Sequence, residues 1–120
     1  MKIMVTGATS FIGSNVVKQL SINKGNIIYA VIRPNSVNWM NLPEADNVKV
    51  IELDMLKIEE LHKYIEEEIN VCYHFAWEGT RMPGRNDNII QNQNYEVAKK
   101  VIDECHKLGC KRFIGVGAQA

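Results

Sequence analysis

The chain has 120 residues, of which 46% are hydrophobic and 23% are charged, and this composition is ordinary for one globular domain with a core. Its net charge of zero does not favour binding to nucleic acid or to an anionic membrane. No stretch reaches the ~18 consecutive apolar residues of a membrane span, and early glycines interrupt any secretory leader. Three cysteines without a Cys-x-x-Cys pair predict free thiols in a cytoplasmic protein that holds no metal.

Short β-branched runs alternate with segments of helical periodicity along the chain, which is typical of a parallel sheet covered by helices. Strands are predicted over residues 2–6, 27–32, 48–53, 71–76 and 112–116. Helices are predicted from Gly13 to about Asn23, over 58–69, and from 90 to 108 before Gly109. A polar loop with glycine and proline fills residues 77–86.

The connections between these strands predict a Rossmann-type, doubly wound α/β fold. Right-handed crossovers and a glycine turn after the first strand imply the strand order 3-2-1-4-5. Residues 1–120 show no repeat and no linker, so we expect a single domain. The carboxyl ends of the strands then meet along one edge, where a ligand is expected to bind.

The sequence from Val5 to Gly13 is the most informative in the chain, because glycines connect a predicted strand to a predicted helix. A helix start offers unpaired N–H groups and a positive dipole end to a pyrophosphate, and glycine lets the backbone approach it. Ser10 stands where the middle glycine of this pattern would be, and it is small enough for a fairly close approach. The candidate pyrophosphate-binding residues are Gly7, Thr9, Ser10, Phe11, Ile12 and Gly13.

Arg33 occupies the position, twenty residues beyond Gly13, where a carboxylate usually binds the adenosine ribose. A guanidinium there suits a 2′-phosphate, with Asn35 and Ser36 as further donors. Charge-assisted hydrogen bonds contribute about 1.5–3 kcal/mol, so Arg33 would favour NADP over NAD by roughly ten- to a hundredfold. The alternative is a solvated residue before a proline turn.

Other polar residues near the predicted strand ends have two interpretations each. Asp54 can accept from an adenine amino group or cap the following helix. The buried amide of Asn94 can tie strand backbones together near the nicotinamide or take part in catalysis. His74 lies in an apolar strand, as a core residue or a catalytic base. Two loop arginines, Arg81 and Arg85, bind an anionic substrate or are simply solvated.

Five ordered segments together resemble the extended short-chain dehydrogenase/reductases, and more narrowly the NAD-dependent epimerase/dehydratase family, whose members act largely on nucleotide sugars. The segments are Thr6–Gly13, Asp54-Met55, His74-Phe75-Ala76-Trp77, Asn94 and Phe113–Gly117. The resemblance implies that Asp54 and Met55 hold adenine, and that Phe75, Ala76 and Trp77 line the cofactor beyond the fourth strand. The family commonly has glycine or alanine after Ala76, so the bulky Trp77 narrows the nicotinamide side.

The catalytic positions depart from the family. Its members use a Ser or Thr after the fifth strand with a Tyr-x-x-x-Lys pair, and here Ala118 stands at the hydroxyl position. Lys99 is the fourth residue after Tyr95, but this pair falls on the helix that covers the cofactor-binding half, so we reject it as catalytic. Whether the chain is an enzyme therefore stays open, and no catalytic residue is assigned.

The expected function is the NADP(H)- or NAD-binding portion of a sugar-nucleotide epimerase, dehydratase or reductase, truncated before its substrate lobe. Its implied partner is a nucleotide-sugar substrate of the full-length protein. The alternatives are a non-catalytic NADP(H)-binding sensor and a mononucleotide-binding α/β domain. The fifth strand becomes a sheet edge, which predicts self-association into a homo-oligomer.

Overall fold

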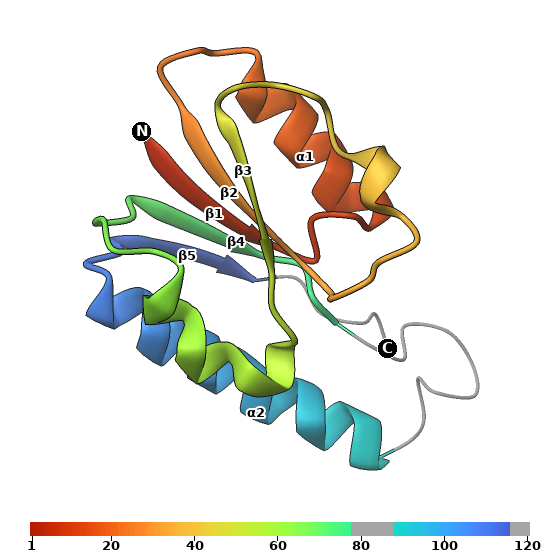
Figure 1. Ribbon diagram of the computed structural model, residues 1–120. Coiled ribbons are helices and arrows are strands. Elements are labelled where there is room, and N and C mark those ends of the chain that lie inside the picture. The colour runs from red at the N-terminus through yellow and green to blue at the C-terminus, as the bar shows by residue number, and fades with distance from the viewer. Residues whose placement is uncertain (78–87, 116–120) are drawn as a thin grey trace.

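A computed structural model of the chain describes residues 1–77 and 88–115 (Figure 1). Five parallel strands form one sheet in the order β3-β2-β1-β4-β5. Their bounds are β1 (Lys2–Thr6), β2 (Ile27–Ile32), β3 (Val48–Glu52), β4 (Val71–His74) and β5 (Arg112–Gly115). The five predicted strands and their order are confirmed, but β3 ends at Glu52 and β4 at His74, one and two residues earlier than predicted. Val116, the predicted end of the last strand, lies outside the described residues.

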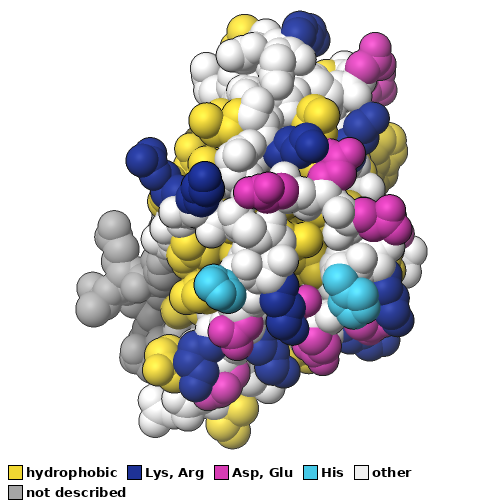
Figure 2. All heavy atoms as spheres, turned by 90° about the vertical axis from the view of Figure 1, so that its left-hand side faces the viewer, with side chains coloured by type: hydrophobic (Ala, Val, Ile, Leu, Met, Phe, Trp, Pro, Cys, Tyr) yellow, Lys and Arg dark blue, Asp and Glu magenta, His cyan; other side chains and the backbone are white. Residues whose placement is uncertain are grey.

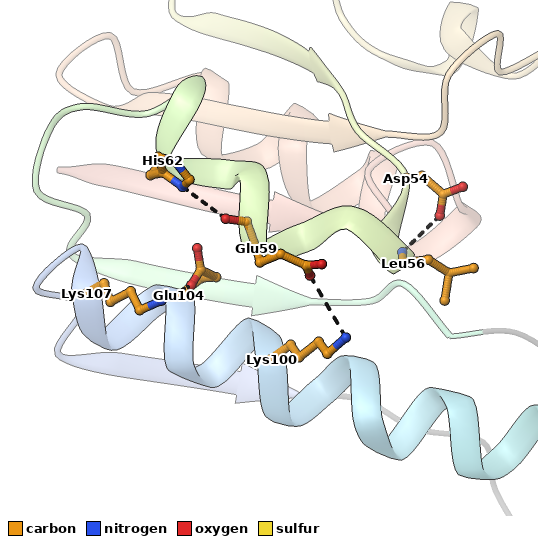
Figure 3. A network of polar contacts seen from close by, with 7 residues as sticks. All are labelled: Asp54, Leu56, Glu59, His62, Lys100, Glu104 and Lys107. Atoms are coloured by element: carbon orange, nitrogen blue, oxygen red, sulfur yellow. Dashed lines mark hydrogen bonds and ion pairs between the residues drawn. The ribbon is translucent and has the colours of Figure 1, made fainter.

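Helical segments cover both faces of this sheet (Figure 1). One face carries α1 (Phe11–Ser21) and η1 (Trp39–Asn41), which is one turn of 3-10 helix. The other carries the 3-10 segment η2 (Met55–Lys63) and α2 (Asn88–Lys107), which lie side by side and are linked by an ion pair between Lys100 and Glu59 at 3.9 Å (Figure 3). The fold is therefore the doubly wound α/β arrangement that the sequence predicts.

Strand β1 shows how one sheet serves two cores. Its side chains alternate, so Ile3 and Val5 pack with Val17 of α1, whereas Met4 packs with Val101 of α2. These three side chains of β1 and their two partners on the helices are all essentially buried. Full burial of such a side chain contributes about 1.5–3 kcal/mol, and a strand buried on both faces reads as a continuous apolar run in the sequence.

Helix α1 begins two residues earlier than predicted, because Ser10 caps it at Phe11 instead of leaving Gly13 as its start. Its buried residues are Gly13, Ser14, Val17 and Ser21, and its apolar Ile12 is 52% exposed. Small residues therefore face the sheet, which lets α1 pack closely beside the turn that precedes it.

The segment predicted as a helix over 58–69 is shorter and of a different type. Asp54 caps a 3-10 segment that ends at Lys63, and Lys57 has non-helical angles (φ −116°, ψ 25°) inside it. Ile65 and Ile69 lie beyond its end and are still buried, as are the preceding apolar positions. The apolar periodicity correctly predicted which residues are buried. A short 3-10 segment followed by turns buries them as well as one continuous helix would.

Helix α2 buries the stripe that its sequence predicts, including Asn94, Val97, Val101 and Cys105. Gly109 follows it with φ 73°, a left-handed conformation that ends helices. Residues 78–87, which include the predicted loop with Arg81 and Arg85, lie outside the described residues, as does Ala118.

The surface on the side where β1 begins carries charges of both signs, with Lys and Arg among Asp and Glu (Figure 2).

All three cysteines are free thiols. Within residues 1–77 and 88–115, no helix combines the length and the apolar character needed to cross a membrane.

Candidate functional site

A cavity of about 780 Å³ opens at the carboxyl edge of the sheet, where the strand order reverses around β1. Residues that follow four different strands line it, together with one face of α2. Arg33 and Asp54 are the charged residues among those described that line it. The sequence-predicted residues that it brings together are Gly7, Thr9, Ser10, Arg33, Asn35, Asp54, Met55, Phe75, Ala76, Trp77 and Asn94.

Gly7 is required where β1 turns toward the cavity. Its φ is +62°, and a Cβ built there would lie 2.7 Å from Ala76 N and from Phe75 C. The backbone after β4 therefore occupies the space where any side chain at residue 7 would go. Conformation and close packing both demand glycine at this position.

Ser10 organises the turn that follows. Its Oγ donates to Gly7 O at 2.8 Å and accepts from Gly13 N at 3.0 Å, and a Cβ on Gly13 would lie 2.2 Å from Gly7 O. Sequence reasoning treated Ser10 as a weakened glycine and missed that it is the helix cap, although serine before a helical run is a known cap signal. Three predicted residues, Phe11, Ile12 and Gly13, lie outside the cavity lining and form the first turn of α1.

A tight turn follows β2 and lines the cavity from Arg33 onward. Ser36 N donates to Arg33 O at 3.2 Å, and Asn35 between them has a left-handed φ of 59°. Asn38 N then donates to Ser36 Oγ at 3.3 Å. Arg33 is exposed at the mouth of the cavity, on a turn whose shape is fixed by local hydrogen bonds.

Asp54 begins the segment after β3. Its carboxylate accepts from Leu56 N at 2.9 Å, and this contact caps η2 (Figure 3). The predicted capping role is confirmed. Because Asp54 is exposed and lines the cavity with Met55, the carboxylate is also accessible to a ligand.

Thr6 and His74 join the ends of the two central strands. Thr6 Oγ1 lies 2.7 Å from His74 Nδ1 and accepts from Phe75 N at 3.1 Å and Ala76 N at 3.2 Å. With both lone pairs used, the hydroxyl donates its proton to Nδ1, so the imidazole is neutral. Burial lowers the pKa of His74 to about 4, in agreement. His74 is a core residue outside the cavity lining, and sequence reasoning gave Thr6 no role.

Trp77 ends the described part of the segment after β4 and is held by helix α2. Its Nε1 donates to Gln91 Oε1 at 3.2 Å, and Asn94 Nδ2 donates to the same oxygen at 3.2 Å. Asn94 is 6% exposed. Sequence reasoning missed Gln91, whose only signal is its position one helical turn before Asn94.

The pair Tyr95 and Lys99, rejected from sequence as catalytic, lies away from the cavity. Tyr95 is 59% exposed, and Lys99 Nζ lies 4.9 Å from the centre of its ring. Neither residue lines the cavity. Within residues 1–77 and 88–115, no three His, Cys, Asp or Glu side chains converge on a metal position.

A parallel sheet of this order, with a glycine turn after its first strand and a cavity at the switch point, defines a Rossmann-type α/β protein. The family model described as NAD dependent epimerase/dehydratase family matches residues 3–120. The chain therefore belongs to that family.

Solved structures extend the comparison. UDP-glucuronic acid 4-epimerase from Bacillus cereus, a Y149F mutant in complex with a fluorinated UDP-glucuronic acid and NAD, is 25% identical with a TM-score of 0.73. UDP-glucose 4-epimerase from Thermotoga maritima, with UDP-glucose, is 26% identical with a TM-score of 0.74. Both alignments cover 96% of this chain, but only 39% of the Bacillus chain and 37% of the Thermotoga chain.

Proposed function

We propose that residues 1–120 form the NAD(P)-binding domain of a protein that acts on nucleotide sugars, with the dinucleotide bound in the cavity at the carboxyl edge of the sheet. The observation that carries this proposal is the glycine turn at Gly7, which opens into that cavity directly before a capped helix. Family membership and the NAD named with the Bacillus epimerase support it.

The start of α1 would hold the pyrophosphate. The first N–H groups of a helix have no partner within it, and Ser10 Oγ already satisfies that of Gly13. Those of Phe11 and Ile12 are left for an anion, beside the backbone of Gly7 and Ser10. The side chains of Phe11 and Ile12 need not face the ligand for this role.

The adenosine would lie over β2 and β3. Asp54 would accept from the adenine amino group while Met55 covers the ring. The Arg33 guanidinium would bind a 2′-phosphate, with Asn35 and Ser36 on the same turn, so we propose NADP as the preferred cofactor. A bound nicotinamide would supply reversible hydride transfer to and from a sugar carbon.

Paired titrations test this function. NADPH and NADH are added separately to the chain and to its Arg33→Asp variant, and binding is followed by cofactor fluorescence. We expect NADPH to bind roughly ten- to a hundredfold more tightly than NADH, and the variant to reverse that order. Absence of binding by either cofactor would contradict the proposed function, whereas binding without discrimination would contradict only the role of Arg33.

A second function, a non-catalytic NADP(H)-binding module, is favoured by Ala118 at the family's hydroxyl position. An assay of UDP-glucose epimerisation by the full-length protein separates the two, because residues 1–120 cover only 39% and 37% of the two epimerase chains. Product formation supports the enzyme. NADPH binding without product supports the module.

Self-association is a further part of the proposal. Strand β5 pairs with β4 on one side, and three of its four residues, Arg112, Ile114 and Gly115, are exposed. An edge strand of this kind offers backbone groups to another chain. Analytical ultracentrifugation should detect a dimer or larger species, and a monomer at high concentration would contradict the expectation.

A further inference from the structure

Three cysteines lie close together near the edge of the sheet where the strands begin, away from the cavity. Cys72 is the second residue of β4, Cys105 lies near the end of α2, and Cys110 lies between α2 and β5 (Figure 1). Cys72 and Cys105 belong to the core between the sheet and α2, and Cys110 packs against that core. The fold therefore gathers thiols from three separate segments into one cluster.

The turn that ends α2 brings Cys105 and Cys110 together. Cys110 N donates to Cys105 O at 2.9 Å, and Gly109 N donates to His106 O at 3.0 Å. With Gly109 in the left-handed conformation, these two hydrogen bonds define a Schellman motif. The side chains of the first and last residues of this motif commonly contact each other. Backbone geometry therefore places the two cysteine side chains side by side.

The three thiols differ in their access to solvent. Cys105 is 3% exposed and Cys72 is fully buried, whereas Cys110 is half-buried. The Cys110 thiol donates to Arg112 O at 3.1 Å and to Asn70 O at 3.8 Å, so carbonyls beside the starts of β4 and β5 hold it. A dissolved oxidant therefore reaches Cys110 before either of the other two.

The thiols also differ in acidity. Hydrogen bonding with the Cys72 thiol lowers the pKa of Cys105 despite its burial, and Cys110 acts in the same direction. The same interaction with Cys105, together with burial, raises the pKa of Cys72. Burial raises the pKa of Cys110 as well. Since the thiolate is the nucleophile, Cys105 is the best nucleophile of the three, and it lies next to the thiol that solvent reaches.

We propose that Cys105 and Cys110 form a reversible disulfide when the protein meets a peroxide, with Cys110 oxidised first and Cys105 as the resolving thiol. The Cys110 sulfur attacks one oxygen of hydrogen peroxide, the O–O bond breaks, and a sulfenic acid and one water are formed. The Cys105 thiolate then attacks Cys110 Sγ, and the S–O bond breaks as the S–S bond forms. The leaving hydroxide takes up the proton that Cys105 lost, so two thiols are oxidised and one peroxide is reduced to two waters.

This modification site is separate from the proposed cofactor site. None of the three cysteines lines the cavity. The disulfide would join the end of α2 to the residues that lead into β5. The inference therefore does not depend on the proposed function, and either can fail without the other.

Trypsin makes the pairing measurable, because it places each cysteine in a peptide of its own. Cleavage after Lys and Arg leaves Cys72 in residues 64–81, Cys105 in 101–107 and Cys110 in 108–111. The chain is treated with hydrogen peroxide, alkylated in urea and digested without reductant for mass spectrometry. We expect 101–107 linked to 108–111, Cys72 alkylated, and the link absent after treatment with dithiothreitol. Free thiols counted after unfolding should fall from three to one per chain.

Single substitutions assign the two roles. In Cys105→Ser, Cys110 should stop at the sulfenic acid, which dimedone traps. Cys110→Ser should keep its thiols for the time in which the wild-type chain loses two, because the remaining cysteines are buried. Cys72→Ala is the matched control and should still form the link, but more slowly, because Cys105 loses the hydrogen bond that lowers its pKa. Circular dichroism checks that each variant folds, and the wild-type peptide map decides the pairing without them.

A link between the Cys105 and Cys110 peptides in the native chain supports the inference. A link through Cys72 overturns it, as do three alkylated cysteines after peroxide treatment. Equal amounts of the three possible pairings overturn it too, because the fold would then not select the partner. Loss of thiols from Cys110→Ser at the wild-type rate overturns the assignment of Cys110 as the thiol oxidised first.

Discussion

The two ends of the cavity are built by different means. On the side of β1 and β2, the main chain does most of the shaping, through Gly7, the Ser10 cap and the tight turn after Arg33. The cap and the turn rest on contacts between residues close in sequence, whereas Gly7 packs against the backbone of Phe75 and Ala76. On the side of β4, side chains from distant segments do it, as with Thr6 and His74, which are 68 residues apart. The first, which we call the main-chain end, depends on backbone shape. The second, which we call the side-chain end, depends on buried polar pairs.

Among these variants, Gly7→Ala is expected to have the largest effect on stability, because it disrupts the backbone of the main-chain end. Its Cβ would meet the backbone of Phe75 and Ala76 at 2.7 Å and would impose a strained φ of +62°. We expect the free energy of unfolding to fall by about 2–5 kcal/mol, measured by urea denaturation. Gly25→Ala is the matched control, since its Cβ would meet only the Asn23 side chain, at 3.2 Å. Equal effects of the two substitutions would contradict this account.

Acid should destabilise the side-chain end through His74. Burial lowers its pKa from 6.5 to about 4, so between these values the unfolded chain binds a proton that the folded chain does not. The free energy of unfolding should therefore fall as the pH falls from 6.5 to 4, by about 3 kcal/mol from this residue, with no further contribution above 6.5. Urea denaturation across this range measures it.

A variant without the titrating ring isolates that contribution. His74→Gln should lose this part of the pH dependence, whatever its stability at pH 7. An unchanged slope between pH 4 and 6.5 in the variant would show that other groups cause it.

Thr6→Val probes the same end at neutral pH. The substitution conserves shape but leaves the Ala76 N–H and His74 Nδ1 without their partner. One buried and one part-buried polar group without partners should lower the free energy of unfolding by about 1–3 kcal/mol. Thr6→Ser keeps the hydroxyl and should cost less, and if serine were as destabilising as valine, the hydroxyl would not be the cause.

Asp54→Ala is expected to have the smallest effect and concerns the segment that follows β3. It removes the contact with Leu56 N that caps η2, so the free energy of unfolding should fall by about 1 kcal/mol. Asp54→Asn keeps a capping oxygen and should recover most of the loss. A larger loss of stability in Asp54→Ala than in Thr6→Val would show that the cap outweighs the buried polar pair.

The same contrast explains what could be predicted from sequence. Gly7, Arg33 and Asp54 were found because they stand at fixed distances along the chain from predicted strand ends. Periodicity predicted burial of Ile65 and Ile69, but it could not show that they lie beyond a short 3-10 segment. Gln91 was missed because its importance comes from Trp77, which reaches it only after the sheet and α2 have packed together.

The central position of β1 has a consequence for how the chain is made. Of the five strands, it is the first to leave the ribosome. Its partner β2 begins about 20 residues later, but β4 is complete only at His74. At roughly 5–20 residues per second, the edge of β1 that later pairs with β4 waits about 4–14 s for its neighbour. During that interval one edge of this strand, whose side chains are hydrophobic on both faces, has no partner, so chaperone binding during translation should concentrate on residues 2–6.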